Sequence, residues 1–195
     1  LVPMPDPAPH EGLRCTFCGS LYPALREPNF ALALFAALND PELTLTMAGR
    51  GWKPFSAATK AAGQVLGSRL VLPGPLPPAE AAALEQDADV LLNLGNTRDE
   101  QMPSKLFAFL GSGKPILHLA ASDSDPLLPF LASYPLALVL HQKDCVTPET
   151  VETLRSWLAQ TRGKRIPYAE AAALYPDYTP DVTAQKLVNG MEESL

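Results

Sequence analysis

A polar loop at residues 98–105, RDEQMPSK, carries the residue types best suited to chemistry in this sequence. It follows a short apolar run that ends in Gly and Asn, DVLLNLGN at 89–96, which is typical of a buried strand. Pro103 suits the first turn of a helix, because its missing N–H costs nothing there. The start of a helix presents unpaired N–H groups and a partial positive charge. The sequence therefore predicts an anion site in this loop.

Several cations lie where they could assist such a site. Lys105 falls in the first turn of the expected helix, where a cation is slightly unfavourable for the helix dipole, and this favours a functional reason for its position. Arg50 and Lys53 follow another strand, in GRGWKP. Solvation at the surface explains these two cations as well as ligand contact does.

The cysteines and histidines are interpreted as structural. Cys15 and Cys18 have the spacing of a redox or zinc motif, but a structural zinc site needs four ligands and the sequence has no second pair. Both fall inside an expected strand, so burial in the core is predicted. His118 and His141 lie in or at the end of strands, with no carboxylate or Cys at ligand spacing. We therefore predict no metal site.

Strand and helix patterns alternate along the chain, and the helices separate the strands throughout. The apolar runs predict strands at 13–19, 43–49, 69–74, 89–94, 115–120 and 136–141. Helices are expected at 29–38, 56–66, 78–86, 103–110, 126–133, 151–160, 168–174 and 182–194. Gly111 and Gly113 are interpreted as stop signals for the fourth helix, and Thr147 as the cap of the sixth with Pro148 at its first position. Parallel neighbours need crossover helices, so the pattern predicts an α/β fold: a Rossmann-like, doubly wound sheet of six parallel strands with helices on both faces.

The expected strand order places two loops side by side. In open sheets of this class ligands bind outside the carboxyl ends of the strands, where the strand order reverses. For the order 3-2-1-4-5-6 this switch point lies between strands one and four. The loop after Gly19 is therefore expected beside the loop at 96–103.

Length and composition limit the class of protein. The chain has 195 residues, about one large domain, which we expect at 13–195 after a proline-rich linker at 1–12. A net charge of −6 argues against a nucleic-acid partner, because a surface that follows phosphates needs clustered Lys and Arg. No apolar run approaches the roughly 18 to 20 residues of a membrane span, and no signal-peptide pattern opens the chain. We expect a cytoplasmic protein.

The segment 89–117 resembles the C-terminal, donor-binding half of GT-B glycosyltransferases, especially the retaining type of family 4. Family members carry glycine turns after their first three strands, then a motif of Glu, seven residues, Glu, a small residue, Gly and Pro. The matches here are Gly19, AGRG at 48–51, PGPL at 73–76 and the block from Glu100 to Pro115. The resemblance covers about residues 13 to 165.

The resemblance implies a role for each matching position. Glu100 matches the glutamate that contacts hydroxyls of the transferred sugar, and Arg26 lies where relatives hold a cation against the diphosphate; these two are the implied catalytic residues. A solvated loop carboxylate and a surface arginine are the alternatives for them. The implied contacts to the diphosphate and sugar are Gly19, Ser20, Gln101, Met102, Pro103, Ser104 and Lys105. The implied vicinity of the base and ribose is Arg50, Gly74, Pro75, Leu76 and Ala108.

Two positions depart from the family pattern. The residue after the first glycine, often Arg in relatives, is Ser20. The second glutamate, which in relatives accepts hydrogen bonds from the ribose, is replaced by Ala108. Losing a charge-assisted hydrogen bond costs on the order of 1.5 to 3 kcal/mol, or about one to two decades in affinity.

The resemblance implies a domain that binds a nucleotide-diphosphate sugar as substrate, with no further cofactor. The acceptor is expected from an N-terminal domain that this sequence does not contain, so we expect the chain alone to be inactive. One alternative is a degenerate, non-catalytic nucleotide-binding or scaffolding domain of the same fold, for which Ala108 is the motive. A flavodoxin-like receiver is disfavoured, because strand one ends in Cys18-Gly19-Ser20 where a receiver would have acidic residues.

Overall fold

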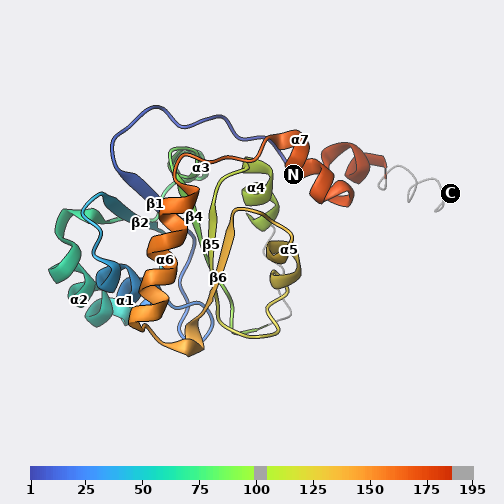
Figure 1. Ribbon diagram of the computed structural model, residues 1–195. Coiled ribbons are helices and arrows are strands. Elements are labelled where there is room, and N and C mark those ends of the chain that lie inside the picture. Colours follow the sequence, from blue (N-terminus) through green and yellow to red (C-terminus); the bar gives the residue numbers. More distant parts are fainter. Residues whose placement is uncertain (99–104, 186–195) are drawn as a thin grey trace.

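Six parallel strands form one sheet in the computed structural model, which describes residues 1–98 and 105–185 (Figure 1). Their order across the sheet is β3-β2-β1-β4-β5-β6, and every neighbouring pair is parallel. The predicted order is therefore confirmed. The strands are β1 (Leu13–Cys18), β2 (Leu43–Ala48), β3 (Leu70–Gly74), β4 (Val90–Leu94), β5 (Ile116–Ala120) and β6 (Ala137–His141).

The burial of the strands follows their place in the sheet. Every residue of β5 is buried, whereas every residue of the edge strand β6 is only partly buried. The other edge strand, β3, alternates between partly buried and exposed residues. Central strands are covered on both faces, which explains why they read in the sequence as continuous apolar runs.

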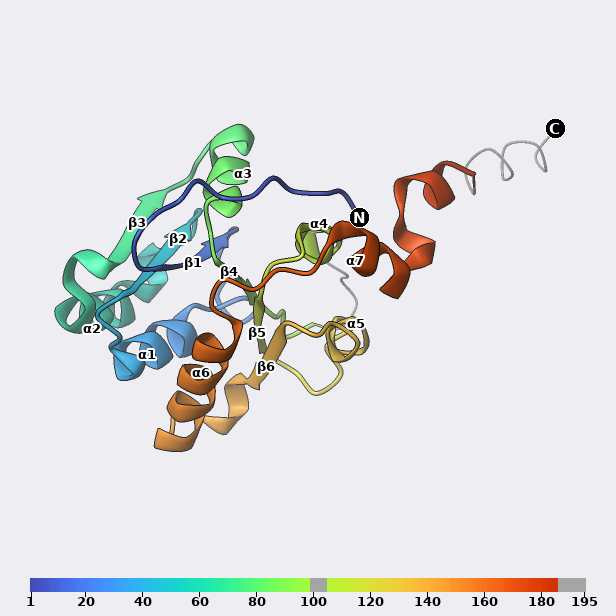
Figure 2. The ribbon, with the colours of Figure 1, turned by 45° about the horizontal axis from the view of Figure 1, so that its top comes forward.

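Helices cover both faces of the sheet, as predicted (Figures 1 and 2). One face packs against α1 (Asn29–Leu38), α2 (Ser56–Leu66) and α6 (Pro148–Thr161). The other face carries α3 (Pro78–Gln86), α4 (Lys105–Ser112) and α5 (Leu128–Ala132), with α7 (Tyr168–Leu174) beside α4. Short 3-10 turns occur at Lys53–Phe55, Gly67–Arg69, Gln142–Asp144 and Pro176–Tyr178. None of the helices in the described ranges has the length and apolar character that crossing a membrane requires.

The capping residues predicted for the helix ends agree with the structure at α6 and differ from it in part at α4. The Thr147 hydroxyl accepts a hydrogen bond from the Thr150 amide at 3.1 Å, so the predicted cap of α6 is confirmed. The predicted end of α4 at Leu110 was two residues early, and Gly111 is not a stop signal. It lies inside α4, where a Cβ atom would come within 2.6 Å of the Val2 carbonyl oxygen. Gly113, at φ 73°, ends the helix.

The expected C-terminal helix at 182–194 lies mostly outside the described residues. Within them, residues 180–185 are helical.

The N-terminal segment, residues 1–12, contains no helix or strand but is fastened to the domain. The Arg165 guanidinium donates to the carbonyl oxygens of Met4 and Pro5 and pairs with Asp6. The segment passes over α4 and α7 and enters β1 (Figure 2).

Lys114 fixes the end of α3 next to the sheet. It is 2% exposed, and its ammonium donates to the carbonyl oxygens of Glu85, Gln86 and Ala88. Cations suit the C-terminal end of a helix, because the last carbonyl groups have no partner within the helix. Lys114 therefore holds α3, and Glu85 with it, at a fixed position.

Candidate functional site

A pocket of about 220 Å³ opens at the carboxyl ends of β1, β2 and β3. Its walls come from the loops after these three strands, from α3 and from the first residue of α4. The lining residues are Cys18, Gly19, Ser20, Ala48, Gly49, Arg50, Pro75, Leu76, Ala81 and Lys105. This is the end of the sheet where ligands bind in open α/β folds.

Two glycines allow the loops after β1 and β2 to meet behind this pocket. A Cβ atom on Gly49 would lie 1.7 Å from the Gly19 carbonyl oxygen, and one on Gly51 would lie 2.1 Å from that of Leu21. Both glycines have positive φ, at 146° and 94°. No other residue fits this conformation and this contact without strain, so the glycines set the shape of the pocket.

Lys105 reaches the pocket from the first position of α4. Its ammonium donates to the Cys18 carbonyl oxygen at 2.6 Å and forms an ion pair with Glu85. The Lys105 side chain is 37% exposed, whereas that of Glu85 is only 10% exposed. The pocket therefore has a cation at its edge and a carboxylate behind its wall.

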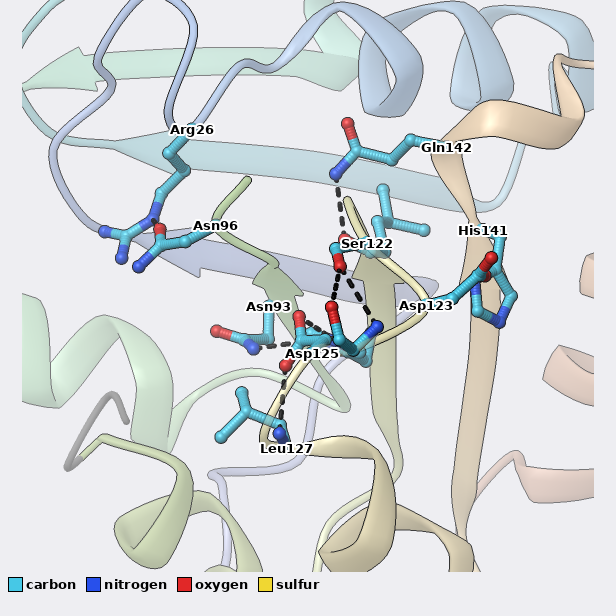
Figure 3. Close-up of polar contacts among 12 residues, drawn as sticks. Arg26, Asn93, Asn96, Ser122, Asp123, Asp125, Leu127, His141 and Gln142 are labelled. Atoms are coloured by element: carbon cyan, nitrogen blue, oxygen red, sulfur yellow. Dashed lines mark hydrogen bonds and ion pairs between the residues drawn. The ribbon is translucent and has the colours of Figure 1, made fainter. Parts of the chain in front are cut away.

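The loops after β1 and β4 are joined directly, as the expected strand order requires. The Thr97 amide donates to the Leu25 carbonyl oxygen at 2.9 Å, and the Thr97 hydroxyl donates to that of Ala24 at 2.6 Å. The Arg26 Nε donates to Asn96 Oδ1 at 2.9 Å (Figure 3). The expectation that these two loops lie side by side is confirmed for residues 96–98, and residues 99–103 lie outside the described residues.

Arg26 is part of this junction. Besides Asn96, its guanidinium contacts the Ser20 carbonyl oxygen at 3.5 Å. Burial lowers the pKa of Arg26 from its usual value, although an arginine stays charged at neutral pH. Arg26 does not line the pocket. Its position ties the loop that carries Gly19 and Ser20 to the end of β4.

A buried polar cluster fastens the loop after β5 to β4 (Figure 3). The Asn93 amide lies 2.9 Å from His118 Nδ1, and His118 Nε2 lies 3.1 Å from Asp125 Oδ2. Because the amide donates, Nδ1 accepts and Nε2 donates to the carboxylate. Asp125 also accepts from the Leu127 amide at 2.9 Å. Burial alone would raise the pKa of Asp125, but the hydrogen bonds from His118 and Leu127 hold it below its usual value.

Both predictions for the histidines were of structural roles. No carboxylate stands at ligand spacing from His118 in the sequence, but the turn after β5 brings Asp125 back onto its ring. Both ring nitrogens are satisfied inside the fold, which supports a structural role. His141 lies 3.2 Å from Asp123, which also pairs with Lys143 at the surface.

Cys15 and Cys18 are both buried in β1, as predicted. Burial, with a smaller contribution from the nearby Glu85 carboxylate, raises the pKa of Cys18 to about 12. The thiol is therefore protonated at neutral pH and unsuited to act as a nucleophile.

Six of the residues singled out from the sequence gather at the pocket: Gly19, Ser20, Arg50, Pro75, Leu76 and Lys105. Gly74 ends β3 beside it, and Ala108 is exposed on α4; neither lines it. The predicted contacts Glu100, Gln101, Met102, Pro103 and Ser104 lie outside the described residues. Glu85 and Asn96 were missed. Glu85 was not predicted because an Ala/Glu-rich helix is typical of a solvent-exposed surface. Asn96 was not predicted because an Asn after a strand is typical of a turn.

A larger cavity, of about 810 Å³, lies at the opposite, amino end of the strands, where residues 7–13 cross the domain. Four of its polar side chains form two pairs. His10 lies 3.3 Å from Asp89, and Arg162 lies 2.6 Å from Glu42. These pairs connect the N-terminal segment and α6 to the sheet.

Comparison with known proteins identifies the fold. The sequence matches no protein-family model and no curated protein sequence. Solved structures do match. The galactosyltransferase WaaB of the lipopolysaccharide outer core has a TM-score of 0.62 at 16% identity, over 100% of this chain and 53% of WaaB.

Two further structures agree. HepE from Anabaena, in complex with UDP and glucose, has a TM-score of 0.65 at 14% identity, over 95% of this chain and 49% of HepE. MurG from Acinetobacter baumannii has a TM-score of 0.60 at 18% identity, over 95% of this chain and 51% of MurG. The chain has the fold of the C-terminal half of a GT-B glycosyltransferase. It spans about half the length of each of these GT-B structures.

Proposed function

We propose that this chain binds a nucleotide-diphosphate sugar as the donor-binding domain of a glycosyltransferase. The observation that carries the proposal is the ammonium of Lys105 at the edge of a pocket at the carboxyl ends of β1, β2 and β3 in a GT-B fold. The proposal is supported by HepE, a protein of the same fold whose structure holds UDP and glucose.

The described residues would divide the donor between them. Breaking the bond between sugar and diphosphate leaves negative charge on the phosphate oxygens, and a fixed cation stabilises that charge. Lys105 lies where it would serve this purpose. The apolar Pro75 and Leu76, together with Arg50, would face the base and ribose. Gly19 and Ser20 would approach the diphosphate through their backbone.

The residues of the polar loop complete the proposed site. Glu100 would accept hydrogen bonds from the sugar hydroxyls, and the backbone N–H groups of Met102 and Ser104, on either side of Pro103, would bind the diphosphate. Arg26 would act beside them, because it fastens the loop that contains Ser20 to the end of β4. The acceptor would come from a second, N-terminal domain across the pocket.

Calorimetric titration with uridine and guanosine diphosphates tests this function. We expect at least one nucleotide to bind to the wild-type chain and to bind more weakly to Lys105→Met. The matched control is Lys60→Met, which removes an exposed lysine from α2. If neither nucleotide binds at millimolar concentration, and Ala108→Glu gains no binding, the non-catalytic scaffolding alternative is favoured.

The proposed division of labour also predicts what the isolated chain does not do. With no acceptor domain, we expect it to bind donor without transferring sugar. Robust turnover by the purified 195-residue chain would contradict the proposal that the acceptor is held by another domain.

A further inference from the structure

Glu85 occupies a position that neither the helix dipole nor burial favours. It lies in the last turn of α3 and is 7% exposed. An anion at the C-terminal end of a helix is opposed by the helix dipole, and taking a carboxylate out of water is costly. Burial accordingly raises the pKa of Glu85, while the charge of Lys105, and to a smaller extent that of Lys114, opposes this shift. A buried carboxylate in this place needs another reason to be there.

The partner of Glu85 is also in an unfavourable position. Lys105 lies at the first position of α4, where the helix dipole disfavours a cation. Two residues that each break a local rule therefore meet in one ion pair. Local rules are broken most often where a protein binds or reacts, and a buried ion pair contributes little net stability.

The pair is built into the wall of the pocket. Ala81, one turn before Glu85 on α3, lines the pocket together with Cys18. The Cys18 thiol points toward the Ala81 carbonyl oxygen at 3.7 Å, so β1 and α3 are in contact there. Glu85 thus reaches Lys105 from behind this wall, while Lys105 itself lines the pocket.

The ammonium of Lys105 can hold its partners inside the protein and still donate to a ligand in the pocket. A lysine ammonium has three N–H groups. One donates to the Cys18 carbonyl oxygen, and the contact with Glu85 is an ion pair without a hydrogen bond to Oε1, so the ammonium keeps N–H groups for whatever occupies the pocket. The hydrogen bond to Cys18 and the ion pair with Glu85 also restrict the rotation of a long side chain, and ordering that chain only on binding would cost affinity.

We propose that Glu85 is a positioning residue, which holds the Lys105 ammonium at the pocket edge so that it meets a phosphate of the donor already oriented. The proposal rests on the proposed function, because it names how that site recognises its anion. Glu85 does not touch the ligand itself; it acts through Lys105.

A double-mutant cycle tests the coupling, with uridine diphosphate as the probe, or guanosine diphosphate if that nucleotide binds more tightly. We expect Glu85→Gln to raise the dissociation constant by about threefold to tenfold, and Lys105→Met to raise it by about tenfold or more. The double variant should bind no more weakly than Lys105→Met. Glu42→Gln, which removes the carboxylate of an ion pair at the other end of the sheet, is the matched control and should leave binding unchanged.

A merely structural role would give a different pattern. In that case Glu85→Gln would weaken binding by the same factor whether or not Lys105 is present, and this result, or an unchanged dissociation constant in Glu85→Gln, overturns the proposal. Thermal unfolding of each variant separates loss of binding from loss of folding. If Glu85→Gln does not fold, Glu85→Asp keeps the charge but draws it back by one methylene, and the same cycle applies.

A second readout does not depend on nucleotide. In protein labelled with isotopic nitrogen on lysine, the side-chain resonance of Lys105 can be assigned by its loss in Lys105→Met. We expect this resonance to move in Glu85→Gln and not in Glu42→Gln. If the wild-type chain binds no nucleoside diphosphate, the proposed function fails and this proposal fails with it. If the wild-type chain binds a nucleoside diphosphate but Glu85→Gln changes neither the Lys105 resonance nor the dissociation constant, only this proposal fails.

Discussion

Ala108 is the residue at which this chain differs most consequentially from the family pattern that it resembles. It is exposed on α4, one helical turn after Lys105, so the two side chains share a face of the helix. A glutamate in this place accepts hydrogen bonds from the ribose in relatives, and an alanine cannot. The space and the backbone for that glutamate are present, since an exposed helical position accepts a larger side chain without strain.

We therefore predict that Ala108→Glu tightens nucleoside diphosphate binding by about tenfold, because it supplies a charged acceptor for the ribose hydroxyls. Calorimetric titration measures the change. Ala82→Glu, on an exposed position of α3, is the control for added negative charge. An equal effect of the two substitutions, or weaker binding by Ala108→Glu, would show that position 108 does not contact the ribose.

Asn96 joins the end of β4 to the loop after β1 through a side-chain hydrogen bond with Arg26. It is 6% exposed, and its amide oxygen accepts from Arg26 Nε at 2.9 Å. Asn96→Ala would leave a half-buried guanidinium N–H without this acceptor. We predict a loss of about 1–3 kcal/mol in the free energy of unfolding, measured by chemical denaturation. Asn29→Ala, which removes a surface contact to Glu27, should cost less, and an equal cost would argue against the junction.

At the level of elements, the turn after β2 depends on the absence of one side chain. In Gly49→Ala the new methyl group would come within 1.7 Å of the Gly19 carbonyl oxygen, which is backbone and has little room to move. We predict a loss of about 1–3 kcal/mol or more in stability, together with weaker nucleotide binding, since the pocket is built from these two loops.

Gly63→Ala is the matched control, because Gly63 lies within α2 and a Cβ atom there meets nothing within 4 Å. Alanine favours a helix over glycine by about 0.5–1 kcal/mol, so this variant should gain stability. If Gly49→Ala were as stable as the wild type, the close contact between the loops after β1 and β2 would be wrong.

The loop after β5 makes the domain sensitive to acid. The pKa of Asp125 is lower in the folded chain than in the unfolded one, so the folded state binds this proton less readily. The stabilisation is therefore complete above the usual carboxyl pKa of about 3.9 and is lost as pH falls through the lower, folded value. We predict that Asp125→Asn lowers stability at neutral pH and makes unfolding less dependent on pH below about 4. Denaturation curves at a series of pH values measure the free energy of unfolding, with Asp87→Asn, at an exposed residue, as the control. If Asp125→Asn loses stability below pH 4 as steeply as the wild type, the prediction is wrong.

At the scale of the whole molecule, the arrangement of the strands was predictable and the contacts behind the pocket were not. Alternating apolar runs and helical segments leave few arrangements for a parallel sheet, which is why the order β3-β2-β1-β4-β5-β6 could be expected. Glu85 could not be expected, because its neighbours Lys105 and Cys18 are brought to it only by the packing of α3 against β1 and α4. Gly111 was misread for the same reason: its role is to admit the backbone of Val2, which is distant in sequence.

Arg165 joins parts of the molecule that are far apart in sequence, and it gives the prediction with the longest reach. Its Nε donates to the Ser112 carbonyl oxygen at 2.7 Å, at the end of α4, while its terminal nitrogens hold residues 4–6. One side chain thus fastens the N-terminal segment to the helix that begins with Lys105.

We predict that Arg165→Ala lowers the free energy of unfolding by about 1–3 kcal/mol and exposes residues 1–12 to proteases, because several carbonyl oxygens lose their donor together. Arg165→Lys should restore only part of this, since one ammonium cannot reproduce the guanidinium fork. Limited proteolysis followed by mass measurement locates the cuts, with Lys164→Ala, at the exposed neighbouring residue, as control. If the segment in Arg165→Ala were as protected as in Lys164→Ala, its attachment would depend on the buried Leu1 side chain and the backbone of Val2 against Gly111, and not on this arginine.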